Sequence, residues 1–328
     1  MFKALIIRKK DDGTQVVKVE NLQYDDLPNN DVLVDIEYST LNYKDCLAIT
    51  NKSPIIRNFP FVPGIDFSGK VAETKSNRFN VGDRVVLNGY GVGEKYWGGL
   101  SQKARVKEDW LTKLPNNISN LNAMAIGTAG YTAMLAVMEI ERKKYKKDTG
   151  EVIVTGVGGG VGGISVSLLS ALGYNVVGAT SRMENSDYIL KLGAKRVISY
   201  DELLESDRPL DKEKWLAGID VLGGKVLERI YASVKYNGIL AVTGLAADIN
   251  FNSTVFPLIL RGVTVIGIDS VYRSQEERED AWNKLSENLN FNHLDNMKKI
   301  ISFDGIIETA KLIMEKKVTG RVIVDINK

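Results

Sequence analysis

Apolar and polar positions alternate along the first third of the chain, and this pattern predicts strands. In Asp31–Tyr38, apolar Val32, Val34 and Ile36 occupy every second position, as in a half-buried strand. Short apolar runs separated by Gly, Pro and Asn continue to about residue 123. Many short strands separated by turn residues predict a β-barrel or β-sandwich for this part.

Other segments of the first third carry the same signals. Ala4–Ile7 and Val16–Val19 flank Asp-Asp-Gly and predict a hairpin. Leu41–Asp45 is predicted to be a loop that leads into a short helix. The remaining predicted strands of this part are Ser68–Glu73, Asp83–Leu87 and Gly99–Val106.

The pattern changes near Ala123, where helical segments begin. Ala123–Met138 is rich in Ala and Met and predicts a helix, in which Gly127 and Gly130 would let another element approach closely. After the charged segment Glu141–Asp148, strand and helix patterns alternate. The predicted strands are 151–155, 175–180, 196–199, 219–222, 238–243 and 263–268, and the predicted helices are 161–172, 184–192, 201–205 and 224–234. This alternation predicts a doubly wound parallel sheet.

The last part of the chain has a third pattern. Gln275–Leu289 and Phe303–Lys317 are predicted helices, and Arg321–Ile326 is a predicted closing strand. A tail after a complete nucleotide fold is expected to return to the first domain. We therefore expect a β-rich domain at 1–123, a nucleotide-binding domain at 124–270 and a C-terminal segment at 271–328.

The stretch Glu151–Gly163, EVIVTGVGGGVGG, places a glycine cluster between a predicted strand and a predicted helix. A helix start has unpaired N–H groups and a partial positive charge, and both favour a pyrophosphate. Gly158–Gly163 matches G-x-G-x-x-G, but glycines at 156, 159 and 162 begin directly where the strand ends, and we prefer this register. The candidate phosphate contacts are Gly156, Gly158, Gly159, Gly160, Val161 and Gly162.

The end of the second predicted strand indicates which dinucleotide is bound. An NAD site carries an acidic residue there that binds the ribose hydroxyls, whereas this chain has Thr180, Ser181 and Arg182, and no acid before Glu184. Hydroxyls and a guanidinium suit a 2′-phosphate. We therefore predict NADP(H) as the cofactor.

Composition excludes several other classes. The 328 residues carry a net charge of +2, with 44% hydrophobic and 26% charged residues, so there is no charge argument for nucleic acid or an anionic membrane. No run of about 18 apolar residues predicts a membrane span, and Phe2–Ile7 is too short for a signal peptide. Cys46 is the only cysteine, which fits a reducing cytoplasm.

The chemistry is further limited by His293, the only histidine, which lies in a polar stretch that predicts a surface loop. One Cys and one His cannot supply the usual tetrahedral zinc ligands, and a Ser-His-Asp triad would depend on His293 alone. We expect no metal. Without zinc to activate an alcohol, the expected substrates accept hydride unaided, as conjugated C=C–C=O groups and quinones do.

The chain resembles the medium-chain dehydrogenase/reductase superfamily and its zinc-free quinone-oxidoreductase branch, closest to the acryloyl-CoA reductase and quinone oxidoreductase subfamily. The residues that carry the resemblance span nearly the whole chain. They are Leu41–Asp45, Ile56–Pro60, Pro63–Gly69, Gly91–Glu94, Trp97–Gly99, Ile126–Ala133, Thr155–Gly162, Leu192–Ala194, Asp269–Val271 and Gly320–Arg321. Pro63–Gly69 lies where zinc-dependent relatives carry Gly-His-Glu, and Gly158 stands where relatives often have Ser or Thr.

The resemblance implies a GroES-like barrel domain and a Rossmann domain. It also implies NADPH contacts at residues beyond the glycine turn, namely Tyr43, Thr180, Ser181, Arg182, Tyr200, Leu245, Ser270 and Arg321. Hydride would pass to the β-carbon of an activated alkene, with Asn42 and Tyr43 as candidate catalytic residues and Tyr43 as the candidate proton donor; water is the alternative donor. A homodimer that pairs the last Rossmann strands, about Val263–Ile268, is implied as well.

Three functions remain open from the sequence. The first is an NADPH-dependent reductase of acryloyl-CoA or a similar enoyl-CoA or enone. The second is an NADPH:quinone oxidoreductase. The third is an NADPH-binding sensor or structural protein with little turnover, which the lack of an evident catalytic acid keeps open. No basic stripe with interleaved aromatic residues supports nucleic acid.

Overall fold

The computed structural model describes all residues from Met1 to Lys328, and its contacts divide the chain into two units. Unit 1 contains residues 1–128, 270–286 and 297–328. Unit 2 contains residues 129–269 and 287–296. Most of the C-terminal tail therefore folds with the β-rich N-terminal part, while a short piece of it folds with the alternating part.

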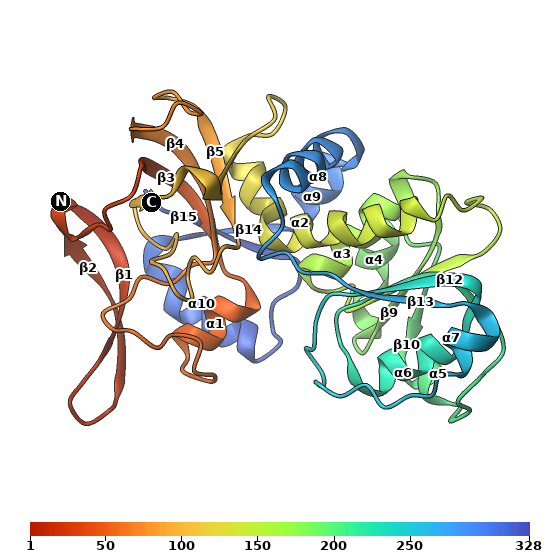
Figure 1. Cartoon of the computed structure of the whole chain (residues 1–328). Helices are drawn as coiled ribbons and strands as arrows, with labels where there is room; N and C mark the ends of the chain where they lie inside the picture. Colours follow the sequence, from red (N-terminus) through yellow and green to blue (C-terminus); the bar gives the residue numbers. More distant parts are fainter. The chain divides into compact units, whose positions relative to one another are not determined.

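Unit 1 is built on a seven-stranded sheet that mixes N-terminal and C-terminal strands (Figure 1). Its strands are β3 (Val32–Thr40), β4 (Asp66–Thr74), β5 (Arg84–Asn88), β6 (Lys103–Val106), β7 (Leu111–Lys113), β14 (Lys298–Ser302) and β15 (Arg321–Asp325). Their order is β14-β15-β3-β4-β5-β7, and β6 also pairs with β3. The closing strand β15 thus lies antiparallel to β3, where Val324 faces Ser39.

The predicted hairpin at the N-terminus is confirmed. β1 (Phe2–Lys9) pairs antiparallel with β2 (Gln15–Leu22), and Lys9 lies opposite Gln15 across the turn. The buried face of β1 packs into the unit 1 core, because Leu5 and Ile7 are fully buried among apolar residues of β3, β4 and β5.

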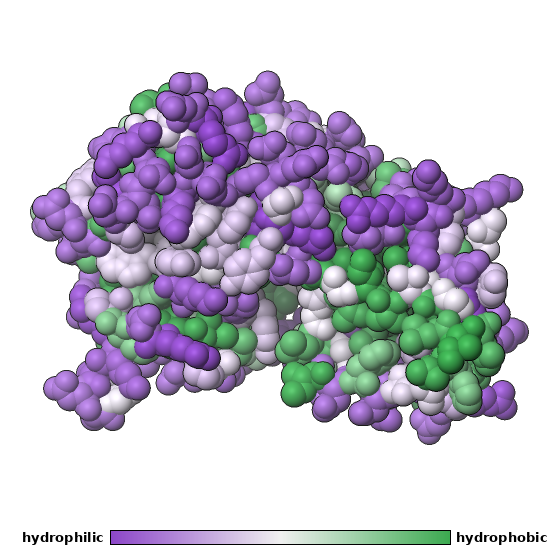
Figure 2. All heavy atoms as spheres, in the orientation of Figure 1, coloured by the Kyte–Doolittle hydropathy of each residue, from purple (hydrophilic) through white to green (hydrophobic).

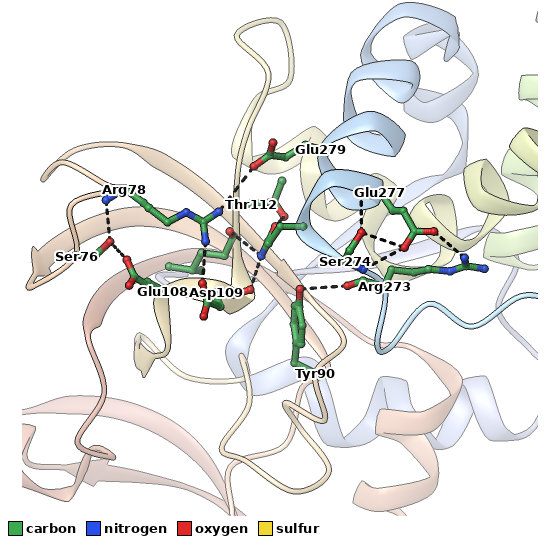
Figure 3. Close-up of polar contacts among 12 residues, drawn as sticks. Ser76, Arg78, Tyr90, Glu108, Asp109, Thr112, Arg273, Ser274, Glu277 and Glu279 are labelled. Atoms are coloured by element: carbon green, nitrogen blue, oxygen red, sulfur yellow. Dashed lines mark hydrogen bonds and ion pairs between the residues drawn. The ribbon is translucent and has the colours of Figure 1, made fainter.

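The helices of unit 1 are short. They are α1 (Tyr43–Ile49) and α10 (Ile306–Met314), with single turns of 3₁₀ helix at η1 (Tyr24–Asp26), η2 (Glu108–Trp110) and η4 (Phe303–Gly305). α8 (Gln275–Asn288) starts in this unit. The start of α8 is tied to η2 and its neighbours by the polar contacts of Figure 3, among them Arg78 to Asp109 at 3.0 Å and to Glu279 at 3.8 Å.

Helix α2 (Asn120–Arg142) joins the two units and is kinked at Gly127, where the backbone has a φ of 53° and a ψ of −161°. This 23-residue helix is long and apolar enough to cross a membrane by length and composition. The sequence analysis predicted no uninterrupted apolar run of about 18 residues, and in this helix Thr128 and Thr132 interrupt the apolar positions. However, 83% of its apolar window is buried inside the protein, as expected for a core helix.

Unit 2 holds a six-stranded parallel sheet in the order β10-β9-β8-β11-β12-β13. Its strands are β8 (Glu151–Thr155), β9 (Asn175–Thr180), β10 (Arg196–Ser199), β11 (Trp215–Asp220), β12 (Val234–Val242) and β13 (Thr264–Gly267). Numbered along the sheet this is the 3-2-1-4-5-6 order of the Rossmann fold, which confirms the doubly wound parallel sheet.

Helices connect these strands, as the alternation predicted. They are α3 (Gly160–Ala171), α4 (Ser186–Lys191) after the 3₁₀ turn η3 (Met183–Asn185), α5 (Tyr200–Leu204), α6 (Gly224–Ala232) and α7 (Phe256–Arg261); α9 (Phe291–Met297) follows later in the chain. The order of the strands reverses between β8 and β11. In doubly wound folds the ligand crevice lies at this reversal, outside the carboxyl ends of the strands.

Several predicted boundaries were wrong. β11 begins four residues before the predicted strand at 219, and β12 begins four residues before 238. The strand predicted from Gly99 begins only at Lys103, because Gly98 and Gly99 pack tightly on the backbone of residues 63–66. The tail strand β14 and helix α7 were not predicted.

The prediction for His293 was also wrong. It lies on α9 and is half-buried, with its Nδ1 2.9 Å from the Ser167 hydroxyl of α3. Burial lowers the pKa of this imidazole. The histidine therefore anchors the returning tail helix to the Rossmann unit, a long-range contact that its polar sequence neighbours did not indicate.

Candidate functional site

The glycine turn of unit 2 begins directly where β8 ends. Gly156 has a φ of 62°, and the Gly159 N–H donates to its carbonyl oxygen at 2.9 Å. Gly159 is the N-cap of α3, and Gly160 is the first helical residue. The N–H groups of the first turn of α3 have no partner within the helix, so they are available to an anion.

Two positions in this turn leave no room for a side chain, one because of backbone atoms and the other because of the Val221 side chain. A Cβ on Gly162 would lie 2.5 Å from the Gly156 carbonyl oxygen, and a Cβ on Gly156 would lie 2.3 Å from Val221 of the loop after β11. The spacing 156, 159, 162 that we preferred thus includes the two glycines on which helix α3 and strand β8 meet.

Arg182 lies beside this turn. A Cβ on Gly158 would lie 2.8 Å from the Arg182 Nη2 atom, so the guanidinium occupies the space above that glycine. The turn after β9 is held by Thr180, whose hydroxyl accepts a hydrogen bond from the Arg182 N–H at 3.0 Å. Thr180 is buried and Ser181 is exposed. A cation therefore stands where an NAD site would carry an acid.

Tyr200 connects the third strand to the first. Its hydroxyl accepts a hydrogen bond from the Gly156 N–H at 3.0 Å. Burial is the largest cause that raises the pKa of this phenol, while Arg182 favours its ionised form. Gly156, Arg182 and Tyr200 thus lie together at the carboxyl ends of β8, β9 and β10.

Asp220, the last residue of β11, was not among the predicted site residues. It is fully buried, accepts a hydrogen bond from the Thr155 hydroxyl at 2.7 Å and also accepts from the N–H groups of Leu222 and Gly223 at 3.1 and 2.7 Å. Burial raises the pKa of this carboxyl. Asp220 ties the end of β8 to the loop after β11, at the point where the strand order reverses. Its position at the end of an apolar strand is the sequence feature from which Asp220 could have been predicted as a site residue.

The other predicted residue of unit 2, Leu245, lies in the loop after β12 and is 64% exposed. Exposed apolar residues continue beyond it, namely Ile249, Phe251, Val255, Phe256, Leu258, Ile259 and Leu260. Figure 2 shows hydrophobic residues gathered over the part of unit 2 where Figure 1 draws α7. Helix α7 is followed in the chain by β13, the edge strand of the sheet.

In unit 1, Asn42 and Tyr43 form the start of α1. Asn42 is the N-cap, and its N–H donates to the Asp45 carboxylate at 2.9 Å. Tyr43 is the first residue of the helix, and it is 53% exposed. The Tyr43 side chain is therefore exposed at a helix start that the hydrogen bond between Asn42 and Asp45 holds in place.

The amide of Asn42 has no hydrogen left for a substrate. Its Nδ2 donates to the Thr40 hydroxyl at 2.8 Å and to the Asp66 carboxylate at 3.0 Å. Its Oδ1 accepts from the Arg321 guanidinium at 3.2 Å. These three bonds assign Asn42 a positioning role, and they argue against it as a proton donor.

Asp66, fully buried at the start of β4, is the centre of this network. It accepts from the Thr40 hydroxyl at 2.5 Å and from the Thr128 N–H at 2.7 Å, in addition to Asn42. The Thr128 N–H is available because the kink at Gly127 interrupts the helical hydrogen bonds of α2. The kink thus supplies a backbone donor to a buried carboxylate.

Arg321, at the start of β15, is only 4% exposed. Its Nε donates to the Ala125 carbonyl oxygen at 3.0 Å. A Cβ on Gly127 would lie 2.3 Å from the Arg321 Nη2 atom, so this glycine makes room for the guanidinium, as the sequence analysis expected of a close approach. Arg321 donates hydrogen bonds to Ala125, Met124 and Asn42, all within unit 1. Its predicted contact with NADPH stays a prediction.

The buried charges are unbalanced, since two carboxylates, Asp45 and Asp66, interact through space with one guanidinium, that of Arg321. Burial, followed by the nearby Asp66, raises the pKa of Asp45 to about 7. Burial lowers the pKa of Arg321, while Asp66 and Asp45 favour its charged form. The network therefore holds a carboxyl that titrates near neutral pH beneath the start of α1.

The donor set of unit 1 does not fit a metal. Gly64-Ile65-Asp66 contains no histidine, and no group of three or more His, Cys, Asp or Glu side chains lies close enough to hold an ion. The Cys46 thiol is buried, and burial together with Asp45 raises its pKa. Thiolate, the form that binds zinc, is disfavoured there.

The predicted site residues fall into two sets, one in each unit. The first set lies at the carboxyl ends of β8, β9 and β10 in unit 2 and consists of Gly156, Gly158, Gly159, Gly160, Val161, Gly162, Thr180, Ser181, Arg182 and Tyr200. Tyr43, Asn42, Ser270 and Arg321 belong to unit 1. There the Ser270 carbonyl oxygen accepts from the Arg278 guanidinium at 3.3 Å. The cofactor contacts of all these residues stay predictions.

Two protein families match this chain. Residues 28–116 match the family described as "Alcohol dehydrogenase GroES-like domain". Residues 160–287 match the family described as "Zinc-binding dehydrogenase". The first match lies in unit 1, and the second covers the unit 2 sheet from α3 onward and the start of the tail.

Full-length relatives include two acrylyl-CoA reductases. The chain is 44% identical over 99% of its length to all of the Escherichia coli protein named "Probable acrylyl-CoA reductase AcuI". It is 42% identical over 100% of both chains to "Acrylyl-CoA reductase AcuI" of Ruegeria pomeroyi. It is also 39% identical to the Bacillus subtilis protein YhfP, which is named as a quinone oxidoreductase; the match covers 99% of this chain and 98% of that one.

Solved structures of similar proteins contain nicotinamide dinucleotides. The yhdH oxidoreductase from Salmonella enterica, in complex with NADP, has a TM-score of 0.96 and 44% identity, covering 98% of this chain and 99% of that one. The Bacillus subtilis protein yhfP, with NAD bound, has a TM-score of 0.94 and 38% identity, covering 99% of both chains.

Proposed function

Because the chain belongs to the medium-chain dehydrogenase/reductase superfamily, we propose that it is an NADPH-dependent reductase of an activated C=C bond, with acryloyl-CoA or a similar enoyl thioester as substrate. The observation that carries the proposal is its identity of 42% along the entire length of the Ruegeria pomeroyi acrylyl-CoA reductase. A match over both whole chains leaves no domain of that relative unaccounted for.

The glycine turn fits NADPH. Gly162 lets α3 pack closely on the end of β8, and the first N–H groups of α3 are available to an anion. Arg182, beside Gly158, suits the 2′-phosphate. When bound, NADPH supplies a hydride; the residues of this edge hold its phosphates and set which dinucleotide fits.

The residues of unit 1 fit the second half of the reaction. Addition of hydride to the β-carbon of the thioester leaves an enolate, which needs a proton at its α-carbon. Tyr43 carries an exposed phenol at the start of α1 and is the side chain that we assign as proton donor. Asn42, Asp66 and Arg321 hold the helix start in place.

The role of Tyr43 can be tested with Tyr43→Phe, which removes the hydroxyl and keeps the ring. We expect kcat for acryloyl-CoA to fall by about 100-fold, the usual order for a positioned general acid, with the affinity for NADPH changed less than kcat. Rates measured across the pH range would check the assignment. An unchanged kcat would mean that water supplies the proton.

A second candidate function is reduction of quinones. The specific support is the full-length similarity to YhfP of Bacillus subtilis. Both reactions begin with the same hydride donor, so the unit 2 site does not distinguish them. The difference lies in the acceptor, which is an acyl thioester in one reaction and a flat ring in the other.

We also infer a homodimer in the cytoplasm. β13 is an edge strand with unpaired backbone groups, and an unpaired edge can pair with a second copy. The exposed apolar residues of α7, Phe256, Leu258, Ile259 and Leu260, precede β13 in the chain and would be covered by a second copy. The single cysteine, buried as a free thiol, is in keeping with a reducing compartment.

One substrate panel separates the candidate functions. The purified protein is mixed with NADPH and, in parallel, with acryloyl-CoA, simple enones and quinones, while NADPH absorbance is followed. Saturable turnover of acryloyl-CoA is the expected result. Turnover of quinones alone would support the second candidate, and binding of NADPH without turnover of any acceptor would favour a sensor or structural role.

A further inference from the structure

Unit 1 contains a cavity of about 190 Å³ that none of the site residues described above lines. Its walls include four aromatic side chains, Phe61, Tyr96, Trp97 and Trp110, and two cations, Lys95 and Arg105. In another protein, an engineered cavity of about 150 Å³ holds benzene. This cavity therefore has room for one flat ring system but not for a whole dinucleotide.

The aromatic wall is held in place from behind. Trp110 ends η2, and its ring lies 4.7 Å from the Tyr96 ring and 6.2 Å from the Tyr90 ring, measured between centroids. As Figure 3 shows, η2 and Tyr90 are tied to the start of α8: the Tyr90 hydroxyl donates to the Arg273 carbonyl oxygen at 3.3 Å. The Gln275 amide donates to the Asp109 carbonyl oxygen, which fixes η2 itself. A ring surface that is fixed in advance loses little entropy when a ligand stacks on it.

The charge of the cavity wall is positive, because Lys95 and Arg105 line it and no Asp or Glu does. Lys95 donates to the Tyr272 hydroxyl at 3.1 Å, and the neighbouring Glu94 carboxylate is paired with Lys44 at 2.9 Å. Arg105 contacts Glu73 at 3.3 Å, and the Glu73 side chain is 62% exposed, so this pair is a weak surface pair. Both cations can therefore turn toward an anion.

We propose that this cavity is the subsite for the nucleotide end of the CoA thioester. The adenine ring stacks between Trp97 and Tyr96, and the phosphates of the nucleotide meet Lys95 and Arg105. Aromatic faces bind bases by stacking, and cations bind phosphate through charge-assisted hydrogen bonds. The identity of the thioester rests on the proposed function, whereas the affinity for a purine bisphosphate does not.

The surroundings of the cavity agree with a ligand that extends beyond it. Asn58 belongs to its wall, and the neighbouring Arg57 and Lys52 are exposed on the same loop, residues 51–60. CoA carries a pyrophosphate between its adenosine and its pantetheine arm. Exposed cations beside the ring pocket would meet that pyrophosphate as it leaves the cavity.

The test measures calorimetric binding of 3′,5′-ADP, the nucleotide end of CoA, to the full-length protein saturated with NADPH. The comparison ligand is 2′,5′-ADP, which matches the nucleotide end of NADPH. We expect 3′,5′-ADP to bind and 2′,5′-ADP to bind far more weakly. Trp97→Ala should weaken 3′,5′-ADP binding by about 5- to 100-fold, the range seen when a stacking ring is lost.

Two milder variants keep the test decisive if Trp97→Ala fails to fold. Trp97→Phe keeps a ring face and should retain affinity within about threefold of the wild type. Lys95→Gln removes one phosphate contact and should cost about tenfold. Lys10→Gln is the matched control on an exposed lysine outside the cavity wall, and it should bind 3′,5′-ADP like the wild type.

Each outcome separates the subsite from the proposed function. Turnover of acryloyl-CoA without binding of 3′,5′-ADP, or binding that ignores Trp97 and Lys95, would overturn the subsite alone. Binding that depends on Trp97, in a protein that does not reduce acryloyl-CoA, would support the subsite and refute the reaction. Equal, Trp97-dependent binding of both bisphosphates would overturn the assignment to CoA.

Discussion

The two units build their sites by opposite means. The phosphate-binding turn of unit 2 is made of backbone: glycines and helix N–H groups that lie within a few residues of one another along the chain. The unit 1 site is made of buried side chains: Asp45, Asp66 and Arg321 come from α1, β4 and β15. Backbone donors carry no net charge to be neutralised, whereas buried side-chain charges must find partners.

This difference teaches where each site is vulnerable. A glycine turn fails when volume is added, because atoms of its own backbone already fill the space. A buried ionic network fails when one charge is removed, because the remaining charges lose their compensation. Four substitutions separate the two cases, and they follow from the largest expected effect to the smallest.

Arg321→Met should have the largest effect. It keeps much of the side-chain volume but leaves Asp66 and Asp45 buried without a cation, and loss of one partner of a buried pair costs about 3–5 kcal/mol. Denaturant unfolding of the full chain measures this. Arg8→Met is the matched control, because Arg8 pairs with Glu20 on the surface with its side chain 46% exposed, where a pair contributes about 0–1 kcal/mol. Equal losses in the two variants would refute the ionic network.

Asp45→Asn tests the charge imbalance through pH. The pKa of Asp45 is raised from 3.8 to about 7, so the folded protein holds its proton more tightly than the unfolded chain. Stability from this group is thus complete below about pH 4 and is lost as pH rises to about 7, by roughly 2–4 kcal/mol. Unfolding curves from pH 4 to 8 should show this fall in the wild type.

In the variant, residue 45 no longer titrates. The hydrogen bonds from the N–H groups of Asn42 and Ile65 change in strength, but this change in free energy does not depend on pH. The difference in stability between Asp45→Asn and the wild type should therefore shift in favour of the variant as pH rises. A difference that stays flat from pH 4 to 8 would mean that Asp45 is ionised throughout.

Gly162→Ala tests the backbone site. Its Cβ would meet the Gly156 carbonyl oxygen at 2.5 Å, and neither backbone segment can move freely, so we expect a loss of about 1–3 kcal/mol. Gly158→Ala is the internal control, because its Cβ meets only the flexible end of Arg182 at 2.8 Å. Unfolding experiments should show Gly162→Ala clearly less stable than Gly158→Ala; the reverse order would disprove the assigned register of the turn.

Arg182→Glu should change selectivity more than stability. Replacing a cation that binds the 2′-phosphate with an anion should lower the preference for NADPH over NADH by at least about tenfold, since a charged hydrogen bond contributes about 1.5–3 kcal/mol. The ratio of kcat/KM for the two cofactors checks this. Lys191→Glu makes the same charge change on an exposed residue of α4, and its ratio should match the wild type. An unchanged ratio in Arg182→Glu would assign the preference elsewhere.

Features set by neighbouring residues could be predicted from the sequence, whereas features set by distant residues could not. Strands β8, β9 and β10 were predicted to the residue, because each has adjacent β-branched apolar residues close to turn signals. The start of β11 was missed because Trp215 and Leu216 follow a charged stretch that hides them. His293 was misjudged because its partner, Ser167, lies more than a hundred residues away in the chain.

The amino-acid sequence by itself determined the strand and helix alternation of unit 2, its glycine turn, and the cation in place of the NAD-type acid, because these are properties of neighbouring residues. Only the tertiary structure decided that the Asn42 amide is fully hydrogen-bonded and that Arg321, buried against α2, is the group that approaches Gly127. Those facts depend on β3, β4 and β15 lying side by side in one sheet. Contacts between residues so far apart in the chain are set by packing, and the local sequence pattern does not predict which residues meet.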